Sequence, residues 1–296
     1  MPPLTRRSFL SASLAFAGAA AVGRLARAAA GRPEGGPGFR IFGCDWTLEK
    51  SCNPEAFPLA RRIGLDGVQV DFGRPPAGGG RPALFDEALQ DRILSAADRE
   101  GVAVASLCLG IANDVPYKRG PAAEAWTLES LAVVRRMKQR VVLLPFFGAG
   151  DLIGDPEGTD EVIRRLRRLA PRAEEAGAVY GIESWLDARE LERILDRVGS
   201  PAIRVYYDVG NMLKMGEDVG AAIRRLGHER ICEVHLKDYQ DLFGRGSTDF
   251  PAVRAALDAA GYRGWLGIEG VKTPLGVEAS LRYDLEYLRP IFPKAA

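Results

Sequence analysis

The stretch ICEVHLKDY, residues 231–239, is a short apolar run that ends in a cluster of polar side chains. It contains His235, one of only two histidines in the 296 residues, and Lys237 and Asp238 follow shortly after it in sequence. Buried parallel strands that present polar groups at their carboxyl ends are typical of α/β barrels, whose active sites lie at that face. The stretch therefore predicts a buried strand with a functional carboxyl end.

Three other apolar runs end in the same way. They are GIES at 181–184, VYYD at 205–208 and LGIEG at 266–270, which carry Glu183, Asp208 and Glu269. With His235, these side chains would lie at the carboxyl ends of four successive strands, where they can converge on one point. An oxygen-rich set with a single imidazole suits one divalent metal ion, with Mn²⁺, Mg²⁺ or Co²⁺ favoured. Zinc stays an alternative, although catalytic zinc usually has more nitrogen or sulfur ligands.

The chain from Phe39 onward alternates between short apolar runs and amphipathic segments. The runs predict strands at 39–44, 67–72, 102–110, 141–147, 179–184, 203–208, 231–237 and 265–270. The segments between and after them predict helices at 54–63, 84–100, 122–138, 159–176, 188–198, 218–226, 250–260 and 277–288. Eight strand-then-helix units of this kind predict a parallel sheet closed into a single-domain (β/α)8 TIM barrel. A doubly wound open sheet is the second choice, but the turn after the first strand, CDWTLEKSC, lacks its glycine-rich phosphate motif.

The first thirty residues differ from the rest. Thr5-Arg6-Arg7-Ser8-Phe9-Leu10 precedes a small-residue apolar run at 12–22 and an alanine-rich segment at 26–30. A charged start, a short apolar middle and a small-residue end predict an export signal, and the paired arginines resemble a twin-arginine (Tat) signal. We expect a signal peptide at 1–30, a flexible linker at 31–38 and the barrel at 39–296, with the protein periplasmic or secreted. No stable membrane anchor is expected, because the apolar run is too short to span a bilayer.

The composition is that of a soluble globular protein. Apolar residues make up 47% and charged residues 27% of the chain, and the net charge is +1. Because there is no excess of positive charge, nucleic acid is not an expected partner. None of the four cysteines forms a CxxC pair, which argues against a zinc ribbon, and whether any of them pair stays open. The sequence also leaves open whether the protein forms homo-oligomers.

The segment from Glu183 to Glu269 resembles the sugar phosphate isomerase/epimerase family of the xylose isomerase-like TIM barrel superfamily. The matching pieces are IES at 182–184, DVGN at 208–211, VHLKD at 234–238, GIEG at 267–270 and the whole passage at 244–269. The resemblance implies that Glu183, Asp208, His235 and Glu269 bind one divalent metal, and that the two glutamates form the acid/base pair. It further implies isomerisation or epimerisation of a ketose or related hydroxy ketone through an enediolate, since removal of the proton next to a carbonyl needs a positioned base and charge stabilisation.

Five further side chains are candidates for binding a small carbohydrate-like substrate: Lys237, Asn211, Trp185, Trp46 and Asp71. The alternative for the lysine is an ion pair with Asp238 or Asp241 at the rim. Asn211 stands where several of the resembled epimerases have a histidine, and an amide can donate a hydrogen bond but cannot shuttle a proton.

Other functions stay open at this point. A keto-sugar lyase or hydratase would use the same site, and a non-catalytic carbohydrate-binding barrel would use the same rim. Endonuclease IV of the same superfamily needs several histidines, which this chain lacks. Strand parity places Arg204 and Glu233 inside the barrel beneath Asp208 and His235, and two opposite buried charges predict an ion pair near its floor.

Overall fold

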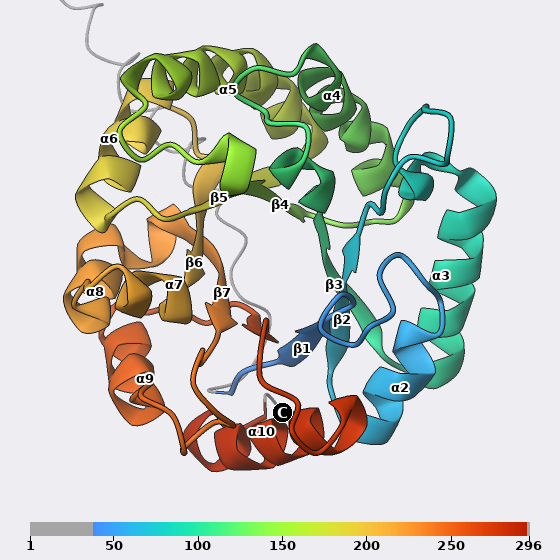
Figure 1. Cartoon of the computed structure of the whole chain (residues 1–296), viewed down its shortest axis with the longest axis vertical. Helices are drawn as coiled ribbons and strands as arrows, with labels where there is room; N and C mark the ends of the chain where they lie inside the picture. The colour runs from blue at the N-terminus through green and yellow to red at the C-terminus, as the bar shows by residue number, and fades with distance from the viewer. Residues whose placement is uncertain (1–37, 295–296) are drawn as a thin grey trace, which may run out of the picture. The chain divides into compact units, whose positions relative to one another are not determined.

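Eight parallel strands close into a barrel in which each strand pairs with the next in sequence and β8 pairs with β1. The computed structural model describes residues 38–294 of the chain. Viewed along the barrel axis, the strands form an inner ring that the helices surround (Figure 1). The strands are β1 (Ile41–Cys44), β2 (Gly67–Asp71), β3 (Ala103–Cys108), β4 (Val141–Phe146), β5 (Val179–Ser184), β6 (Ile203–Asp208), β7 (Ile231–Leu236) and β8 (Leu266–Ile268). The predicted single-domain (β/α)8 barrel is thus confirmed.

The outer layer is built from the amphipathic segments. Its helices are α2 (Ala56–Ile63), α3 (Glu87–Glu100), α4 (Pro121–Arg136), α5 (Pro156–Ala176), α6 (Ala188–Val198), α7 (Val209–Lys214), α8 (Val219–Arg230), α9 (Phe250–Ala259) and α10 (Val277–Ile291). Short 3-10 turns lie at Ala83–Phe85, Gly110–Asn113 and Gly148–Gly150.

The sequence fixes the helix ends locally. At the N-terminus of α6, the side chain of Asp187 accepts a hydrogen bond from the backbone N–H of Glu190, whose own side chain accepts from the N–H of Asp187. This reciprocal pair satisfies two backbone N–H groups that have no acceptor within the helix. At the other end Gly199 adopts a left-handed conformation with φ 72°, which a glycine takes without strain. Such ends let each unit turn back to the barrel at a defined residue.

Two helices differ from the prediction. The helix expected at 218–226 continues to Arg230 across a kink at Gly227, where φ is 67° and ψ is 168°. The helix α7 was not predicted, because its first residues directly continue the strand β6 without a loop. Asp208 closes the strand and also caps α7, since its Oδ1 accepts a hydrogen bond from the backbone N–H of Asn211 at 2.9 Å. One carboxylate therefore sets the direction of the chain as it leaves the barrel.

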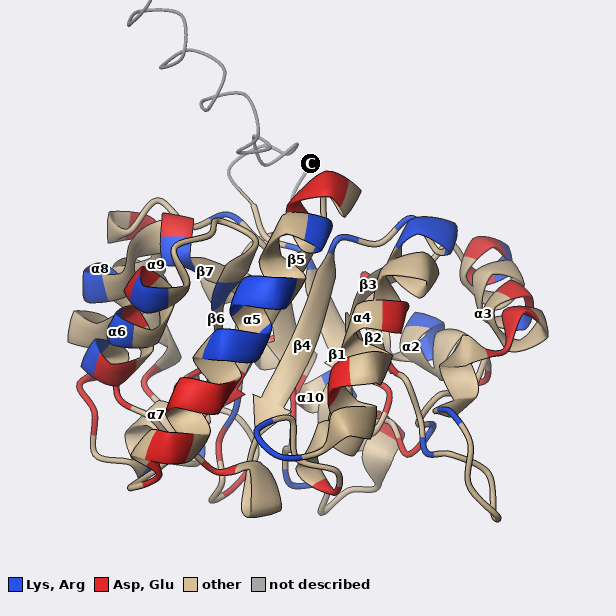
Figure 2. Cartoon of the chain, turned by 90° about the horizontal axis from the view of Figure 1, so that it is seen from above, with Lys and Arg blue, Asp and Glu red and all other residues tan. Residues whose placement is uncertain are grey.

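Charge on the outside is mixed. Lys and Arg alternate with Asp and Glu over the helices seen from the side (Figure 2). Ion pairs link neighbouring helices, as between Arg168 and Glu124 or Arg136 and Asp91. Among the helices of residues 38–294, none combines the length and apolarity that a membrane span requires. The predicted signal at 1–30 and all but the last residue of the predicted linker at 31–38 lie outside the described residues. All four cysteines are free.

Candidate metal centre

The carboxyl ends of β5 to β8 bring four side chains together inside the barrel. Glu183, Asp208, His235 and Glu269 each offer one ligand atom, and these atoms lie within 4.8 Å of one another. Asp208 and His235 are paired residues on adjacent strands, so they emerge from the sheet at the same level. Glu269 directly follows β8, whose Gly267 pairs with His235. The common carboxyl edge of the parallel strands, together with side-chain parity, produces this convergence.

Burial dominates the protonation of this cluster. It raises the pKa of Glu183 to about 8, with help from the charge of Glu269. Burial likewise raises the pKa of Asp208 to about 8, against the opposing charge of Lys237. The pKa of His235 falls to about 4, because its imidazolium would also have to be buried. The site thus gathers more carboxylate than it can keep ionised without an additional positive charge.

Lys237 supplies part of that positive charge. Its ammonium nitrogen lies 3.4 Å from Oδ2 of Asp208 and forms a second ion pair with Oε2 of Glu269. Burial alone would lower the pKa of Lys237, but the charges of Asp208, Glu269 and Glu183 raise it overall. Burial alone would raise the pKa of Glu269. The charges of Lys237 and His235 and the hydrogen bonds from Lys237 and Trp46 outweigh burial, so the pKa is lowered overall.

The alternative pairing of Lys237 with a neighbouring rim carboxylate is not found. Asp238 is buried and accepts hydrogen bonds from the backbone N–H groups of Gln240 and Thr248, both at 2.8 Å. Its carboxylate therefore holds the loop after β7, and Lys237 is free to turn toward the cluster.

The donor set fits a divalent metal ion. Three carboxylates and one neutral imidazole supply hard oxygen donors and one nitrogen, the combination that Mn²⁺, Mg²⁺ and Co²⁺ accept. Oε2 of Glu269 is buried and accepts no hydrogen bond of normal geometry, although the ammonium of Lys237 lies against it. A buried carboxylate oxygen in this position is available as a ligand.

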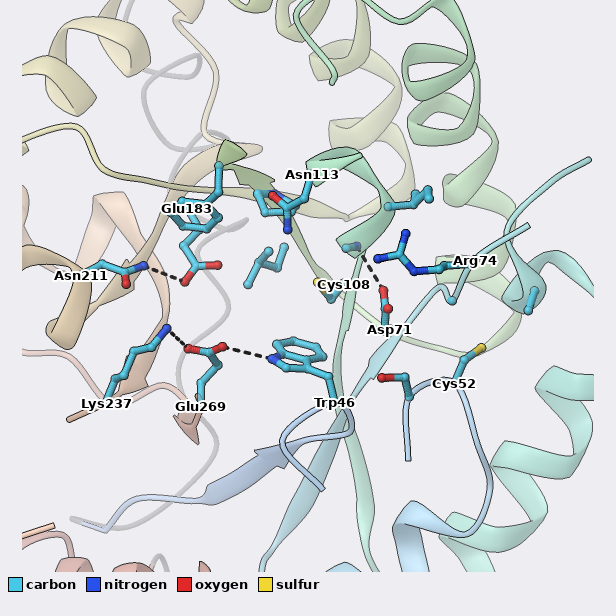
Figure 3. A pocket seen from close by; sticks show the side chains of 18 of the residues that line it. Trp46, Cys52, Asp71, Arg74, Cys108, Asn113, Glu183, Asn211, Lys237 and Glu269 are labelled. Atoms are coloured by element: carbon cyan, nitrogen blue, oxygen red, sulfur yellow. Dashed lines mark hydrogen bonds and ion pairs between the residues drawn. The ribbon is translucent and has the colours of Figure 1, made fainter. Parts of the chain in front are cut away.

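Besides Lys237, two of the candidate substrate residues touch the acidic cluster directly. The indole Nε1 of Trp46 donates a hydrogen bond to Oε1 of Glu269 at 3.0 Å, and Nδ2 of Asn211 donates to Oε1 of Glu183 at 3.4 Å. Tyr239, which the sequence did not single out, donates its hydroxyl to Oδ1 of Asn211. Each of the two glutamates is therefore oriented by its own donor (Figure 3).

The cluster opens into a cavity of about 590 Å³ at the carboxyl face of the barrel. Trp185 lines this cavity and packs edge-on against Phe147, with ring centroids 5.0 Å apart. Asp71 lies on the far side from Glu183 and Lys237, where its Oδ1 accepts a hydrogen bond from the N–H of Gly110 at 3.1 Å (Figure 3). The structure thus places all five candidate substrate residues around one cavity, with Asp71 remote from the metal ligands.

The predicted ion pair between Arg204 and Glu233 is wrong. Arg204 is half-buried at the amino end of β6, and its Nε donates to the carbonyl of Pro201 at 3.1 Å. The pairing of β6 with β7 shifts register next to Tyr206, so that Tyr206 lies opposite Glu233. Glu233 instead accepts hydrogen bonds from the hydroxyls of Tyr206 and Ser106, each at 2.7 Å.

Sequence reasoning also missed the residues that contact His235 from below. Gln69 lies 3.0 Å from its Nε2, and Cys44 lies 3.4 Å from the same atom. The signal was present, because the strand GVQVD at 67–71 carries a polar residue, Gln69, at an inward-facing position two residues before Asp71. A buried amide in such a strand needs polar partners, and it finds them on strands far away in sequence.

The fold and the place of the cluster, at the carboxyl ends of the last four strands, are those of a (β/α)8 barrel with a candidate metal centre at its carboxyl face. Residues 57–291 match the Xylose isomerase-like TIM barrel family, and the chain belongs to that family. It is 28% identical over 263 residues to 2-epi-5-epi-valiolone 7-phosphate 2-epimerase of an Actinoplanes species, a match that covers 84% of this chain and 93% of that protein. Over 150 residues it is 30% identical to inosose dehydratase of Geobacillus thermodenitrificans, which covers 40% of this chain and 49% of that protein.

The solved structures agree on the fold. D-psicose 3-epimerase of Clostridium cellulolyticum H10, solved with D-tagatose, superimposes with a TM-score of 0.71 at 14% sequence identity. The match covers 86% of this chain and 99% of that chain. The same architecture is therefore kept while most of the sequence differs.

Proposed function

We propose that the protein is a divalent-metal-dependent isomerase or epimerase that acts on a ketose or a related hydroxy ketone through an enediolate. The observation that carries the proposal is the pair Glu183 and Glu269, which lie in one buried cluster and whose pKa values shift in opposite directions. Two carboxyl groups whose environments separate their pKa values can serve as an acid and a base at the same pH.

In this scheme Glu269 is the ionised partner. Lys237 and the indole N–H of Trp46 stabilise its carboxylate, so it can remove a carbon-bound proton next to the substrate carbonyl. Glu183, in the same cluster, returns a proton to the other face of the carbon; the raised pKa that burial and the charge of Glu269 give it belongs to the metal-free site. In the reverse reaction, Glu183 acts as the base and Glu269 returns the proton.

The remaining residues orient these two groups. Asn211 donates to Glu183, and Asp208 and His235 complete the ligand set with the two glutamates. A divalent ion bound there would supply the positive charge that stabilises the enediolate oxygens. The aromatic faces of Trp46 and Trp185 provide the cavity wall on which a sugar can pack.

We further propose that the substrate carries no phosphate. Lys237 and Arg74 are the only Lys or Arg residues among the described residues that line the cavity, and carboxylates engage both of them. Phosphate recognition usually relies on Arg or Lys side chains that are free to donate. The Actinoplanes relative is named for a phosphorylated substrate, so this chain would differ from it at that point.

The test is solvent exchange at the substrate carbon. The full chain, loaded with Mn²⁺, is incubated in D₂O with a panel of ketoses that includes D-psicose and D-tagatose, and deuterium is followed by NMR. We expect incorporation with inversion, and its loss in Glu183→Gln and Glu269→Gln. The matched control is Glu286→Gln on the exposed face of α10, which should keep full activity. Exchange that survives in both active-site variants at normal metal content would refute the assignment.

The inosose dehydratase relative favours one alternative, a lyase that removes water from a keto sugar. The first step, proton removal next to a carbonyl, is shared, but the enediolate then expels a hydroxyl group. The same NMR experiment separates the two, because a lyase produces an unsaturated or dehydrated product. Sugar binding without any exchange in the metal-loaded protein would instead indicate a non-catalytic carbohydrate-binding barrel.

The predicted Tat signal is the basis of a second proposal, that the protein acts outside the cytoplasm. Arg6 and Arg7 precede the apolar run at the spacing of an export signal. Replacing both with lysine should leave the protein in the cytoplasm and its N-terminus uncut. Export of this double variant at the normal rate would count against the twin-arginine route.

A further inference from the structure

Below the candidate metal centre, four polar side chains fill the inside of the barrel. Gln69 on β2, Ser106 on β3, Tyr206 on β6 and Glu233 on β7 are all buried. We call them the interior network. They form a continuous series of hydrogen bonds from Glu233 at the bottom to His235 at the top, across strands that are distant in sequence. A buried series of this kind has a direction, because each N–H or O–H can donate only once.

The direction is set at the bottom. Oε2 of Glu233 accepts from the hydroxyls of Ser106 and Tyr206, each at 2.7 Å. Each hydroxyl has one proton, so after this donation its oxygen is left as an acceptor. The amide nitrogen of Gln69 fills both acceptors, at 3.1 Å from Ser106 Oγ and 2.9 Å from Tyr206 OH. The amide oxygen of Gln69 must therefore point the other way, toward His235.

At the top, Oε1 of Gln69 lies 3.0 Å from Nε2 of His235 and accepts a weaker bond from the thiol of Cys44 at 3.3 Å. A carbonyl oxygen can pair with an imidazole nitrogen only if that nitrogen carries the proton. The other ring nitrogen, Nδ1, lies 3.3 Å from Oε1 of Glu183 and faces the ligand cluster.

We infer that Gln69 is a positioning residue: its amide, oriented by Ser106, Tyr206 and Glu233, fixes His235 in the Nε2–H tautomer and leaves the Nδ1 lone pair directed at the metal site. The inference rests on the proposed function, because it assigns a role toward the metal that the proposal requires. It concerns only side chains of this protein, however, and it holds in the metal-free state.

The reversed arrangement is disfavoured. With the Gln69 amide turned over, Ser106 and Tyr206 would have to donate to it, and Oε2 of Glu233 would lose both donors. An unsatisfied buried acceptor is costly, and more so when it is charged. His235 would then carry its proton on Nδ1, pointing an N–H at the metal site. The carboxylate at the bottom therefore selects the tautomer at the top.

Packing holds the same ring in place. The ring of Tyr206 lies against that of His235 with centroids 4.5 Å apart, and Phe42 and Trp46 contact its other sides edge-on. Tyr206 thus acts twice, through its ring on the imidazole and through its hydroxyl in the network. Partners that orient a ligating histidine typically change metal affinity by about 10- to 100-fold when they are removed.

The direct test is the tautomer itself. The full chain, labelled with ¹⁵N-histidine and free of metal, is examined by multiple-bond ¹H–¹⁵N NMR at about pH 8, where imidazoles are neutral. Only two histidines contribute. Nδ1 of His228 lies 2.9 Å from the carbonyl oxygen of Ala260, so His228 should show the opposite, Nδ1–H form and serve as an internal reference. A spectrum with His235 protonated on Nδ1 would overturn the inference.

The variant test is Gln69→Met, which keeps the length of the side chain and removes its polarity. We expect His235 to lose the pure Nε2–H form and the dissociation constant for Mn²⁺ to rise about 10- to 100-fold in calorimetry. Gln69→Glu keeps an acceptor oxygen toward His235, so the Nε2–H form should return. The matched control is Gln90→Met on α3, a buried glutamine whose amide donates to the carbonyl of Leu84 at 2.7 Å, far from the site.

The outcomes separate the inference from the proposed function. If Gln69→Met keeps both the tautomer and the Mn²⁺ affinity of the parent, or if Gln90→Met weakens Mn²⁺ binding as strongly, the positioning role is refuted. If the tautomer and the affinity change as expected but no ketose exchanges deuterium, only the proposed reaction fails.

Discussion

The ammonium nitrogen of Lys237 lies 3.4 Å from Oδ2 of Asp208 and forms a second ion pair with Oε2 of Glu269. Both carboxylates belong to the set that would hold a metal, so one lysine balances part of the charge of that set. The lysine is buried, and its removal would leave carboxylates without a neighbouring cation.

The first prediction concerns this charge balance. Lys237→Met should destabilise the metal-free protein by about 3 kcal/mol at about pH 8, because an uncompensated buried charge is costly. Mn²⁺ should restore more stability to the variant than it adds to the parent protein. Urea unfolding with and without Mn²⁺ measures both effects. The control is Lys214→Met, an exposed lysine on α7 that packs over Trp185 and pairs with no carboxylate of the site. Equal stability of Lys237→Met and the parent without metal would contradict the prediction.

The second prediction concerns protons released by metal binding. Burial raises the pKa of Glu183 from 4.5 to about 8 and that of Asp208 from 3.8 to about 8, so both carry protons at about pH 6. Because metal ligands must be deprotonated, Mn²⁺ binding should release up to about two protons at that pH and few above about pH 9. Calorimetry in buffers of different protonation enthalpy measures the release. A release that does not change with pH would show that these carboxyls are already ionised.

The same shifts predict how stability depends on pH. The pKa values of Glu183 and Asp208 are higher in the folded protein than in the unfolded chain, so the folded state binds these protons more tightly. Their contribution to the stability of the metal-free protein is therefore complete below about pH 4 and is lost as the pH rises toward about 8. Saturating Mn²⁺ should remove this loss. Denaturant midpoints of Glu183→Gln, which lacks one of the two groups, should change less over that range.

The fold was predictable because each strand and helix carries its own signals. Short runs such as VYGIES and IRVYYD carry a charged residue at or next to their carboxyl end, and the helices that follow have an apolar face and a capping residue. The four residues of the candidate metal centre could be placed because they lie at the ends of such runs, and parallel strands bring like ends together. None of this requires knowledge of contacts between distant segments.

The interior network could not be predicted, because it depends on contacts between segments that are distant in sequence. Gln69 and Tyr206 are 137 residues apart, and which side chains meet inside a closed barrel depends on the register of every strand pair between them. Tyr206 lies opposite Glu233, and Arg204 instead turns to the carbonyl of Pro201 at the amino end of β6. Parity identified Glu233 as an inward-facing residue, but only the barrel shows what it contacts.

The fourth prediction concerns the indole of Trp46, which donates to Glu269 at 3.0 Å. Trp46→Phe removes this bond, which helps to keep the pKa of Glu269 low, so that pKa should rise. If Glu269 acts as the base, the acid limb of the kcat/KM profile should move to higher pH. Trp185→Phe, which changes the same side chain on the opposite wall without a bond to either glutamate, is the control. An unshifted acid limb in Trp46→Phe would mean that the indole serves only as a packing surface.

The last prediction concerns the close approach of β8 to the metal-site histidine. A Cβ placed on Gly267 would lie 2.9 Å from Cδ2 of His235 and closer still to the ring of Phe42. Gly267→Ala should therefore displace the imidazole, destabilise the protein by about 1–3 kcal/mol and weaken Mn²⁺ binding. Adding Phe42→Leu, which opens space on the other side, should recover part of the stability.

The control for this last change is Gly220→Ala near the start of α8. There the added Cβ would meet the end of the Arg224 side chain at 3.1 Å, which can move away, and Oδ1 of Asp218 at 3.4 Å, an ordinary contact distance. The substitution should be neutral or stabilise the protein by up to about 1 kcal/mol, since alanine favours a helix over glycine. Thermal unfolding and Mn²⁺ titration of all three variants test the argument together. If Gly267→Ala binds Mn²⁺ as tightly as Gly220→Ala, the position of the His235 ring does not require a glycine at residue 267.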